Sequence, residues 1–323
     1  MSDGHPPRNI GLDLVRVTET TALAAGRWIG SGNFAATHRA ASHAMLSALN
    51  ALDMDGRIVI GEESRLGEEA PLRSGQRVGT GNGPEVDVVV DPIDGTNLLI
   101  KGRPGAISVV GVAPRGSLWS PVPAIYMEKL VVDREAAQAL VPECMDAPIA
   151  WTLALIARVK QRAVRDLTVI VLDRPRHQDL IEEIRTAGAR VLLRDEGDAE
   201  GALIAATPNT GVDLLVGIGG ASQGVIAACA VKALDGAMLA RLAPQSQVER
   251  DSVKEAGLDE KQILNCREMV TSDEIFFAAT GITDSALLRA MQFHRGYAET
   301  HSLLIRAETG TRRFIYAEHA ARV

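Results

Sequence analysis

The stretch VDVVVDPIDGT, residues 86–96, joins a run of β-branched residues to two carboxylates at the point where a strand must end. The valines favour a buried strand, and Pro92 holds the backbone of Asp91 extended before the chain turns. Asp94 then projects beside Asp91. Two close carboxylates without a basic neighbour repel each other, so the pair predicts a shared hard divalent cation with oxygen ligands.

Residues on either side of this pair extend the candidate site. Gly95 and Thr96 can open a helix, whose free backbone N–H groups would hold an anion such as phosphate. Glu62 and Glu63 follow another expected strand. Alone they would be an ordinary solvated pair, but beside the hexapeptide they become candidate metal ligands. A plain turn rich in Asp, Gly and Thr is the alternative interpretation of the hexapeptide, and the preceding strand makes it the weaker one.

Farther along, strands and helices alternate from about residue 150. Such alternation predicts an α/β protein with a mostly parallel sheet and crossover helices. We expect a metal- and phosphate-binding lobe over residues 1–150 and a β/α substrate lobe over residues 151–323, with a soft boundary inside one compact unit. Other expected elements are a helix over 37–52 capped by Thr37, an irregular segment over 240–270 and a helix near 285–291.

Composition excludes several classes of protein. Of 323 residues, 46% are apolar, which is enough for a core and excludes a disordered chain. The net charge of −7 argues against a general nucleic-acid binder, because phosphate backbones require clustered Lys and Arg. No apolar run reaches about 18 residues, and the N-terminus lacks a secretory apolar segment. We therefore expect no membrane association and a cytoplasmic location. Three distant cysteines form neither a disulfide framework nor a zinc pattern.

Taken together, these motifs resemble those of a known family. Glu62 followed by the hexapeptide is similar to the metal-dependent, lithium-sensitive sugar- and inositol-phosphate phosphatases, and most of all to the class II bacterial fructose-1,6-bisphosphatases, some of which also take sedoheptulose 1,7-bisphosphate. Further motifs occur in the same order: MDG (54–56), VGTG (78–81), YMEK (126–129), RPRH (174–177), GIGGA (217–221) and ALDG (233–236). The resemblance implies a layered αβαβα-type sandwich with two sheets.

The resemblance also implies hydrolysis of a sugar phosphate ester, with carboxylates holding magnesium or manganese ions. It places Glu62, Asp91 and Asp94 on metal positions, and Thr96 on the position that orients the attacking water. Residues on phosphate- or sugar-binding positions are Asp94, Gly95, Thr96, Tyr126, Arg174, Arg176 and Asp198. Family members form oligomers, so a homo-oligomer or a hetero-oligomer with a paralogue is expected.

Several positions differ from the family pattern. Where the family has Gly-x-Gly-Asp-Lys and an Asp four residues beyond the Lys, this chain has Asn33, Phe34 and His38. Gln223 stands at a metal-binding Glu and is a weak ligand at most. These differences predict that the chain holds one Mg²⁺ or Mn²⁺ ion or has lost metal binding. Phe34 would make the pocket more apolar or stack on a base or sugar face.

Three functions are compatible with this pattern. The first, which we favour, is metal-assisted hydrolysis of a phosphorylated sugar by Glu62, Asp91, Asp94 and Thr96. The second is another reaction of a sugar or nucleoside on the same scaffold, such as dehydration, with His38 as general acid/base and no obligatory metal. The third is a non-catalytic paralogue that pairs with an active relative. The candidate catalytic residues are Thr96, Asp91 and His38.

Overall fold

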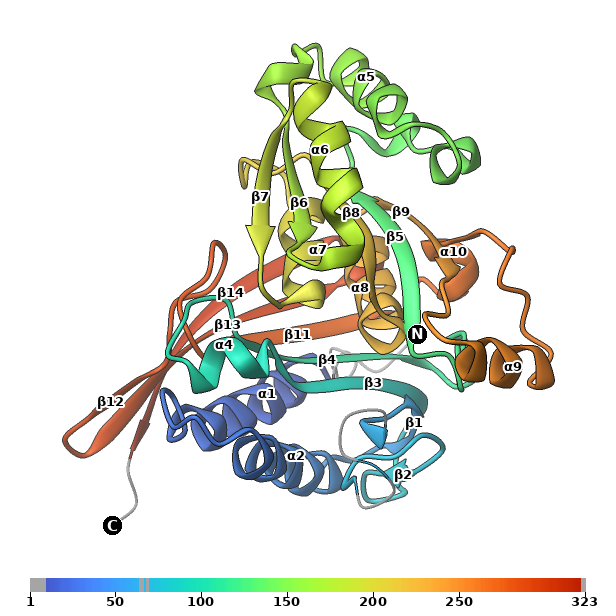
Figure 1. Ribbon diagram of the computed structural model, residues 1–323. Coiled ribbons are helices and arrows are strands. Elements are labelled where there is room, and N and C mark those ends of the chain that lie inside the picture. Colours follow the sequence, from blue (N-terminus) through green and yellow to red (C-terminus); the bar gives the residue numbers. More distant parts are fainter. Residues whose placement is uncertain (1–9, 64–66, 68–69, 321–323) are drawn as a thin grey trace, which may run out of the picture.

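The computed structural model describes residues 10–63, 67 and 70–320, which form two stacked β-sheets with helices on both sides and between them (Figure 1). Helices α1 (Gly11–Gly26) and α2 (Phe34–Asn50) cover the outer face of the first sheet. Helices α7 (Asp198–Ala206) and α8 (Ala221–Ala233) lie between the sheets. Helices α5 (Ile149–Val159) and α6 (Gln178–Thr186) cover the second sheet. The predicted αβαβα sandwich is therefore confirmed.

The first sheet has eight strands, in the order β12-β13-β11-β4-β3-β1-β2 with β14 paired to β13. The strands are β1 (Asp55–Ile60), β2 (Arg77–Val78), β3 (Glu85–Asp94), β4 (Ile107–Pro114), β11 (Phe276–Gly281), β12 (Gln292–His294), β13 (Tyr297–Arg306) and β14 (Thr311–Ala320). Only β1 and β3 pair in parallel among these described strands. Strands from both ends of the chain thus share one sheet.

The second sheet has six strands, in the order β10-β9-β5-β8-β6-β7. The strands are β5 (Tyr126–Val132), β6 (Thr168–Leu172), β7 (Arg190–Arg194), β8 (Leu214–Gly220), β9 (Ala237–Leu242) and β10 (Leu264–Asn265). The expected parallel pairing holds for β7-β6-β8, where strands and helices alternate, whereas β5, β9 and β10 pair antiparallel. The sheet is therefore mixed rather than mostly parallel. The division at residue 150 stays a prediction.

Two helices between the sheets explain the large apolar core. All of α7 and all of α8 except Lys232 are buried. A helix that meets a sheet on each side needs apolar or small residues all round instead of a single stripe, and Ala, Val and Ile supply them here. The core between the sheets extends to Val89 of β3 and Ile170 of β6. Within the described residues, no helix is long and apolar enough to cross a membrane.

Some local expectations were wrong. Helix α2 begins at Phe34, three residues before the expected start, because the Asn33 side chain accepts a hydrogen bond from the Ala36 N–H at 3.1 Å and caps the helix. Residues 285–291 form bends instead of a helix. The segment expected to be irregular over 240–270 contains α9 (Gln247–Glu255) and the short α10 (Cys266–Met269).

Candidate functional site

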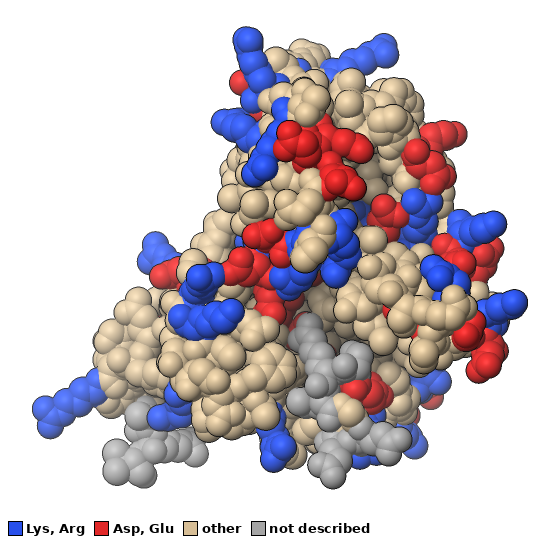
Figure 2. All heavy atoms as spheres, in the orientation of Figure 1, with Lys and Arg blue, Asp and Glu red and all other residues tan. Residues whose placement is uncertain are grey.

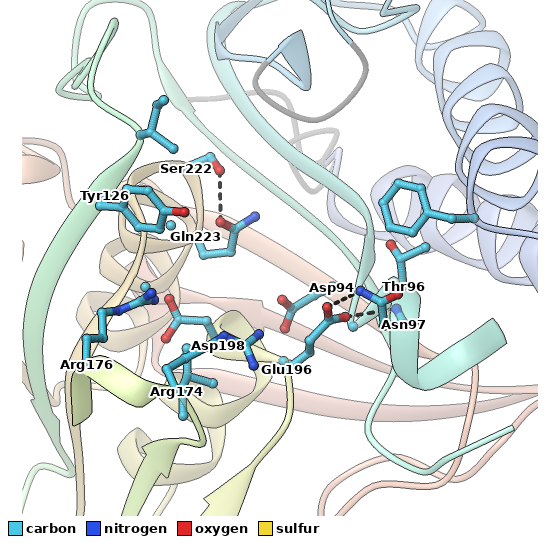
Figure 3. A pocket seen from close by; sticks show the side chains of 17 residues that line it. Asp94, Thr96, Asn97, Tyr126, Arg174, Arg176, Glu196, Asp198, Ser222 and Gln223 are labelled. Atoms are coloured by element: carbon cyan, nitrogen blue, oxygen red, sulfur yellow. Dashed lines mark hydrogen bonds between the residues drawn. The ribbon is translucent and has the colours of Figure 1, made fainter. Parts of the chain in front are cut away.

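A pocket of about 340 Å³ opens where β3, β6, β7 and β8 end and where α2, α7 and α8 begin (Figure 3). Ligands of α/β proteins commonly bind at such strand ends. The pocket brings together nine residues singled out from the sequence, which are Phe34, Asp94, Gly95, Thr96, Tyr126, Arg174, Arg176, Asp198 and Gln223. Glu62, Asp91 and His38 are buried and do not line it. Asn97, Glu196 and Ser222 complete the polar part of the wall.

Both aspartates of the hexapeptide lie in the last part of β3. The register between β3 and β4 shifts between Asp91 and Asp94, so β3 continues through an irregularity instead of ending at Asp91. Asp91 Oδ1 accepts a hydrogen bond from the Ile93 N–H at 3.1 Å, and Thr96 Oγ1 donates to the Ile93 carbonyl at 3.1 Å. Gly95 has φ +90° before α4 (Thr96–Ile100), a conformation that favours glycine.

A buried histidine faces the first of the expected metal-binding carboxylates. His38 Nε2 lies 3.0 Å from Glu62 Oε2, and the two side chains are 0% and 1% exposed. His38 Nδ1 lies 3.3 Å from Ser42 Oγ, one turn along α2. The Phe34 ring packs at 5.7 Å from the His38 ring and lines the pocket. The imidazole is therefore fixed behind Phe34 and engaged through both nitrogens.

A glutamine amide faces the second carboxylate. Gln223 Nε2 donates to Asp91 Oδ2 at 2.7 Å. Ser222 Oγ donates to Gln223 Oε1 at 3.0 Å (Figure 3). Because a carboxylate only accepts hydrogen bonds, Asp91 orients the amide so that its NH₂ group faces Oδ2. A Cβ atom at position 220 would lie 1.9 Å from Gln223 Oε1. The glycine at this position therefore makes room for the amide.

Hydrogen bonds join the two sheets beside the pocket. Asp94 Oδ2 accepts from the Glu200 N–H in the first turn of α7 at 2.8 Å. The Asn97 backbone N–H donates to Glu196 Oε2 at 2.9 Å, and the Asn97 side-chain amide donates to Glu196 Oε1 (Figure 3). Arg194 forms an ion pair with Glu200. The loop after β7 is therefore held against the end of β3.

Two arginines and a tyrosine form the opposite wall. The Arg176 guanidinium lies over the Tyr126 ring at 5.1 Å and donates to the Ile218 carbonyl at 2.9 Å. Burial lowers the pKa of Arg176, but a guanidinium stays charged at any ordinary pH. Arg174 donates to the Asp173 carbonyl at 3.0 Å. In the described part of the chain, no carboxylate lies within 4.0 Å of either guanidinium, so both charges remain available to an anion.

Several positioning residues were missed in the sequence. Lys129 is fully buried and forms an ion pair with Asp198 at the pocket wall. Glu249 of α9 accepts from the N–H groups of Ile125 and Tyr126 at 2.8 and 2.9 Å. The lysine that precedes the apolar end LVV of the strand YMEKLVV was a visible signal for the first contact. The Glu249 contact spans more than a hundred residues and left no local signal.

His177, which follows Arg176, anchors the arginine segment. Its Nε2 accepts from the Ile218 N–H at 2.8 Å, and its Nδ1 lies 2.7 Å from the Leu172 carbonyl. These partners require a neutral ring with its proton on Nδ1. Burial lowers the pKa of His177, and the nearby Arg176 charge acts in the same direction.

The expected Mg²⁺ or Mn²⁺ ion does not fit the residues as they are arranged. The described residues contain no group of three or more His, Cys, Asp or Glu side chains that could hold a metal ion. Glu62 Oε2 faces the His38 imidazole, and Asp91 Oδ2 faces the Gln223 NH₂ group. Hard cations require oxygen ligands, and an N–H donor supplies none. The donor set therefore differs from that of a carboxylate-rich two-ion centre.

The comparisons with known proteins agree over almost the whole chain. A family model described as bacterial fructose-1,6-bisphosphatase, glpX-encoded, matches residues 8–319. A D-fructose 1,6-bisphosphatase class 2/sedoheptulose 1,7-bisphosphatase from Synechococcus sp. (strain JA-3-3Ab) is 39% identical, with 96% of this chain and 95% of the relative covered. A fructose-1,6-bisphosphatase class 2 from Haemophilus influenzae is 38% identical, with 97% and 96% covered.

Proposed function

The chain belongs to the glpX-encoded bacterial fructose-1,6-bisphosphatase family, and on this premise we propose that it binds a phosphorylated sugar in the pocket and hydrolyses its phosphate ester slowly. The observation that carries the proposal is the pair Arg174 and Arg176, which line the pocket without a carboxylate partner among the described residues. Two guanidinium groups match the oxygens of a phosphate and bind it through paired hydrogen bonds.

The remaining wall supports a sugar next to that phosphate. The Tyr126 ring offers an apolar face and a hydroxyl, and Asp198 offers a carboxylate that accepts hydrogen bonds from sugar hydroxyls. The names of the relatives give fructose 1,6-bisphosphate and sedoheptulose 1,7-bisphosphate as their substrates. A phosphorylated ketose is therefore the substrate class that we assign to this pocket.

The chain's own residues support slow hydrolysis. Thr96 donates its hydroxyl proton to the Ile93 carbonyl, so its oxygen is left to accept a hydrogen bond from a water at the pocket wall. That water would attack phosphorus as the P–O bond to the sugar breaks, and one proton of the water would pass to the departing sugar oxygen. Phosphoryl transfer depends on positioning and on neutralising the charge of the transferred group. With only Arg174 and Arg176 to neutralise it, the rate is expected to be low.

A non-catalytic binding protein is the second candidate. It is favoured by the two contacts in which His38 meets Glu62 and Gln223 meets Asp91, because two of the three carboxylates that the family pattern assigns to metal are already paired within the chain, Glu62 by an ion-pair contact and Asp91 by a hydrogen bond. A sugar reaction with His38 as acid/base has less support, since His38 is fully buried and Phe34 lines the pocket in its place. Assembly with a further copy or a paralogue stays a prediction.

Calorimetric titration with fructose 1,6-bisphosphate, followed by a phosphate-release assay, tests the proposal. Arg174→Ala should weaken binding about tenfold or more, since it removes a charged hydrogen-bonding group. Arg165→Ala is the matched control, because Arg165 is exposed at the opposite end of β6. A folded wild-type protein that neither binds nor hydrolyses fructose 1,6-bisphosphate, its monophosphates or sedoheptulose 1,7-bisphosphate would overturn the proposal.

A further inference from the structure

We propose that the His38 imidazole and the Gln223 amide take the places of divalent cations, so that the pocket is assembled and binds its phosphorylated ligand without a metal ion. The part of this inference that concerns the ligand rests on the proposed function. Glu62, Asp91 and Asp94 are 1%, 0% and 2% exposed. Buried carboxylates must be compensated by charges or hydrogen-bond donors, and the source of that compensation decides whether the fold needs a cation.

His38 compensates Glu62 from a fixed position. Ser42 holds Nδ1 from the following turn of α2, and the Phe34 ring packs on the imidazole from the preceding turn. Nε2 is therefore the nitrogen that faces Glu62 Oε2 at 3.0 Å. The approach of Nε2 to Glu62 Oε2 is an ion-pair contact without hydrogen-bond geometry, so the compensation that it gives Glu62 is electrostatic.

Gln223 compensates Asp91 from the other sheet. Its amide orientation is set by the Asp91 carboxylate, which only accepts hydrogen bonds. Ser222 donates to Oε1, and the glycine at position 220 leaves space for that oxygen. The NH₂ group then points at Asp91 Oδ2 at 2.7 Å. The reversed amide would place Oε1 against the carboxylate and would lose the hydrogen bond to Asp91. The contact therefore has one favoured orientation.

Protein donors also compensate the third carboxylate. Asp94 Oδ2 accepts from the Glu200 N–H at 2.8 Å, which ties the end of β3 to the first turn of α7. The neighbouring contact between Asn97 and Glu196 joins the same two segments. The two sheets are therefore held together beside the pocket by hydrogen bonds. A divalent ion would have to displace the donors on Glu62 and Asp91 and also give up its own water.

Thermal unfolding after dialysis against a chelator tests the inference without an activity assay. Adding Mg²⁺ or Mn²⁺ to the wild-type protein should move Tm by less than about 1 °C. The double variant His38→Asp/Gln223→Glu replaces both donors with carboxylates. It should melt lower than the wild type after chelation and should gain about 5 °C or more with Mn²⁺.

A matched control separates metal binding from added charge. His43→Asp/Gln262→Glu makes the same two changes at exposed positions, the first of them on α2 as well. This control should behave as the wild type does. A gain of several degrees by the wild-type protein with either metal, together with stoichiometric metal uptake in calorimetry, would overturn the inference. This outcome is measured on the wild-type protein, so it does not depend on whether the variants fold.

Ligand binding separates this inference from the proposed function. Titration of the wild-type protein with fructose 1,6-bisphosphate should give dissociation constants that agree within about twofold with chelator and with Mn²⁺. Binding only in the presence of Mn²⁺ would overturn the inference and leave the proposed function standing. Failure to bind in both conditions would reject the proposed function, whereas the unfolding experiment with metal alone would still decide the inference.

Discussion

Gln223 Nε2 donates a 2.7 Å hydrogen bond to Asp91 Oδ2 and so joins the start of α8 to the end of β3. Both side chains are buried, and the residues are 132 positions apart in the chain. The contact lies behind the pocket, where the family pattern predicts a metal ion. It therefore links the stability of the two-sheet core to a position at which the family pattern has a metal ligand.

Asp91→Ala should destabilise the protein while leaving its fold intact. The change leaves the Gln223 NH₂ group and the Ile93 N–H without their acceptors in a buried place, which costs about 1–3 kcal/mol for each unsatisfied group. Urea unfolding measures the loss. Asp91→Asn keeps one acceptor and should lose less than Asp91→Ala. Asp91→Ala should also abolish any metal-dependent phosphate release. A folded Asp91→Ala protein with full metal-dependent activity would contradict the assignment of Asp91 to a metal position.

Fructose-1,6-bisphosphatase activity should be very weak in the wild-type protein, with or without Mg²⁺. The reason is that His38 and Gln223 stand where the family pattern has carboxylates, so one half of a two-ion clamp is missing. A phosphate-release assay with saturating substrate measures turnover directly. A value in the ordinary enzyme range of about 1–10³ per second would show this reasoning to be wrong.

Lys129→Met should reduce both stability and ligand affinity. The lysine is fully buried and paired with Asp198, which lines the pocket. Removing one partner of a buried ion pair typically costs about 3–5 kcal/mol, because the other charge stays buried without compensation. Denaturant unfolding and calorimetry measure the two effects. The double variant Lys129→Met/Asp198→Asn should regain part of the stability, and an equal or larger loss in the double variant would mean that the lysine acts through packing alone.

Stability should fall as the pH falls below about 6.5, in part because of His177. Burial lowers the pKa of His177 from the ordinary value of 6.5. The unfolded chain therefore takes up the proton first, so the contribution of the neutral ring is complete above about pH 6.5 and is lost as the pH falls toward the lower folded pKa, by at most about 1.4 kcal/mol per pH unit.

Urea unfolding at a series of pH values checks the His177 effect. His177→Gln keeps a donor and an acceptor for the Leu172 and Ile218 backbone groups but does not titrate. Its free energy of unfolding should therefore depend less on pH than that of the wild type. His43→Gln, at an exposed position on α2, should keep the wild-type dependence. Identical slopes for wild type and His177→Gln would remove His177 from the explanation.

Local sequence patterns predicted the strand and the turn that form part of the pocket. Contacts between residues distant in the sequence determine which side chains of the site are paired with one another. The strand before Asp91 and the turn through Thr96 depend on neighbours in sequence, so the valines and Pro92 are enough to predict them. The pairing of His38 with Glu62 and of Gln223 with Asp91 joins distant segments. Propensity and spacing carry no information about which partner such side chains will meet.

The wrong local predictions have equally particular reasons. Asn33 and Thr37 both belong to residue types that cap helices, and only the structure shows that Asn33 caps α2 while Thr37 Oγ1 donates to the Asn33 carbonyl at 2.6 Å. The Ser285 hydroxyl accepts from the N–H groups of Leu287 and Leu288. In this case the capping-type contact is not followed by a helix, because the chain turns into β12 within a few residues.

The triple variant His38→Asp/Phe34→Lys/Gln223→Glu should bind Mg²⁺ more tightly than the wild type and should release phosphate faster. Two of the changes add carboxylates next to Glu62 and Asp91, and oxygen replaces nitrogen as the harder ligand. Phe34 lines the pocket, so Phe34→Lys should act on the phosphate or on the charge balance of the pocket and should raise turnover more than metal affinity. Calorimetry with Mg²⁺ on the wild type, the triple variant and the double variant without Phe34→Lys separates these effects, alongside the phosphate-release assay. Unchanged Mg²⁺ affinity in the folded triple variant would mean that the pocket differs from the family pattern in more than these three residues.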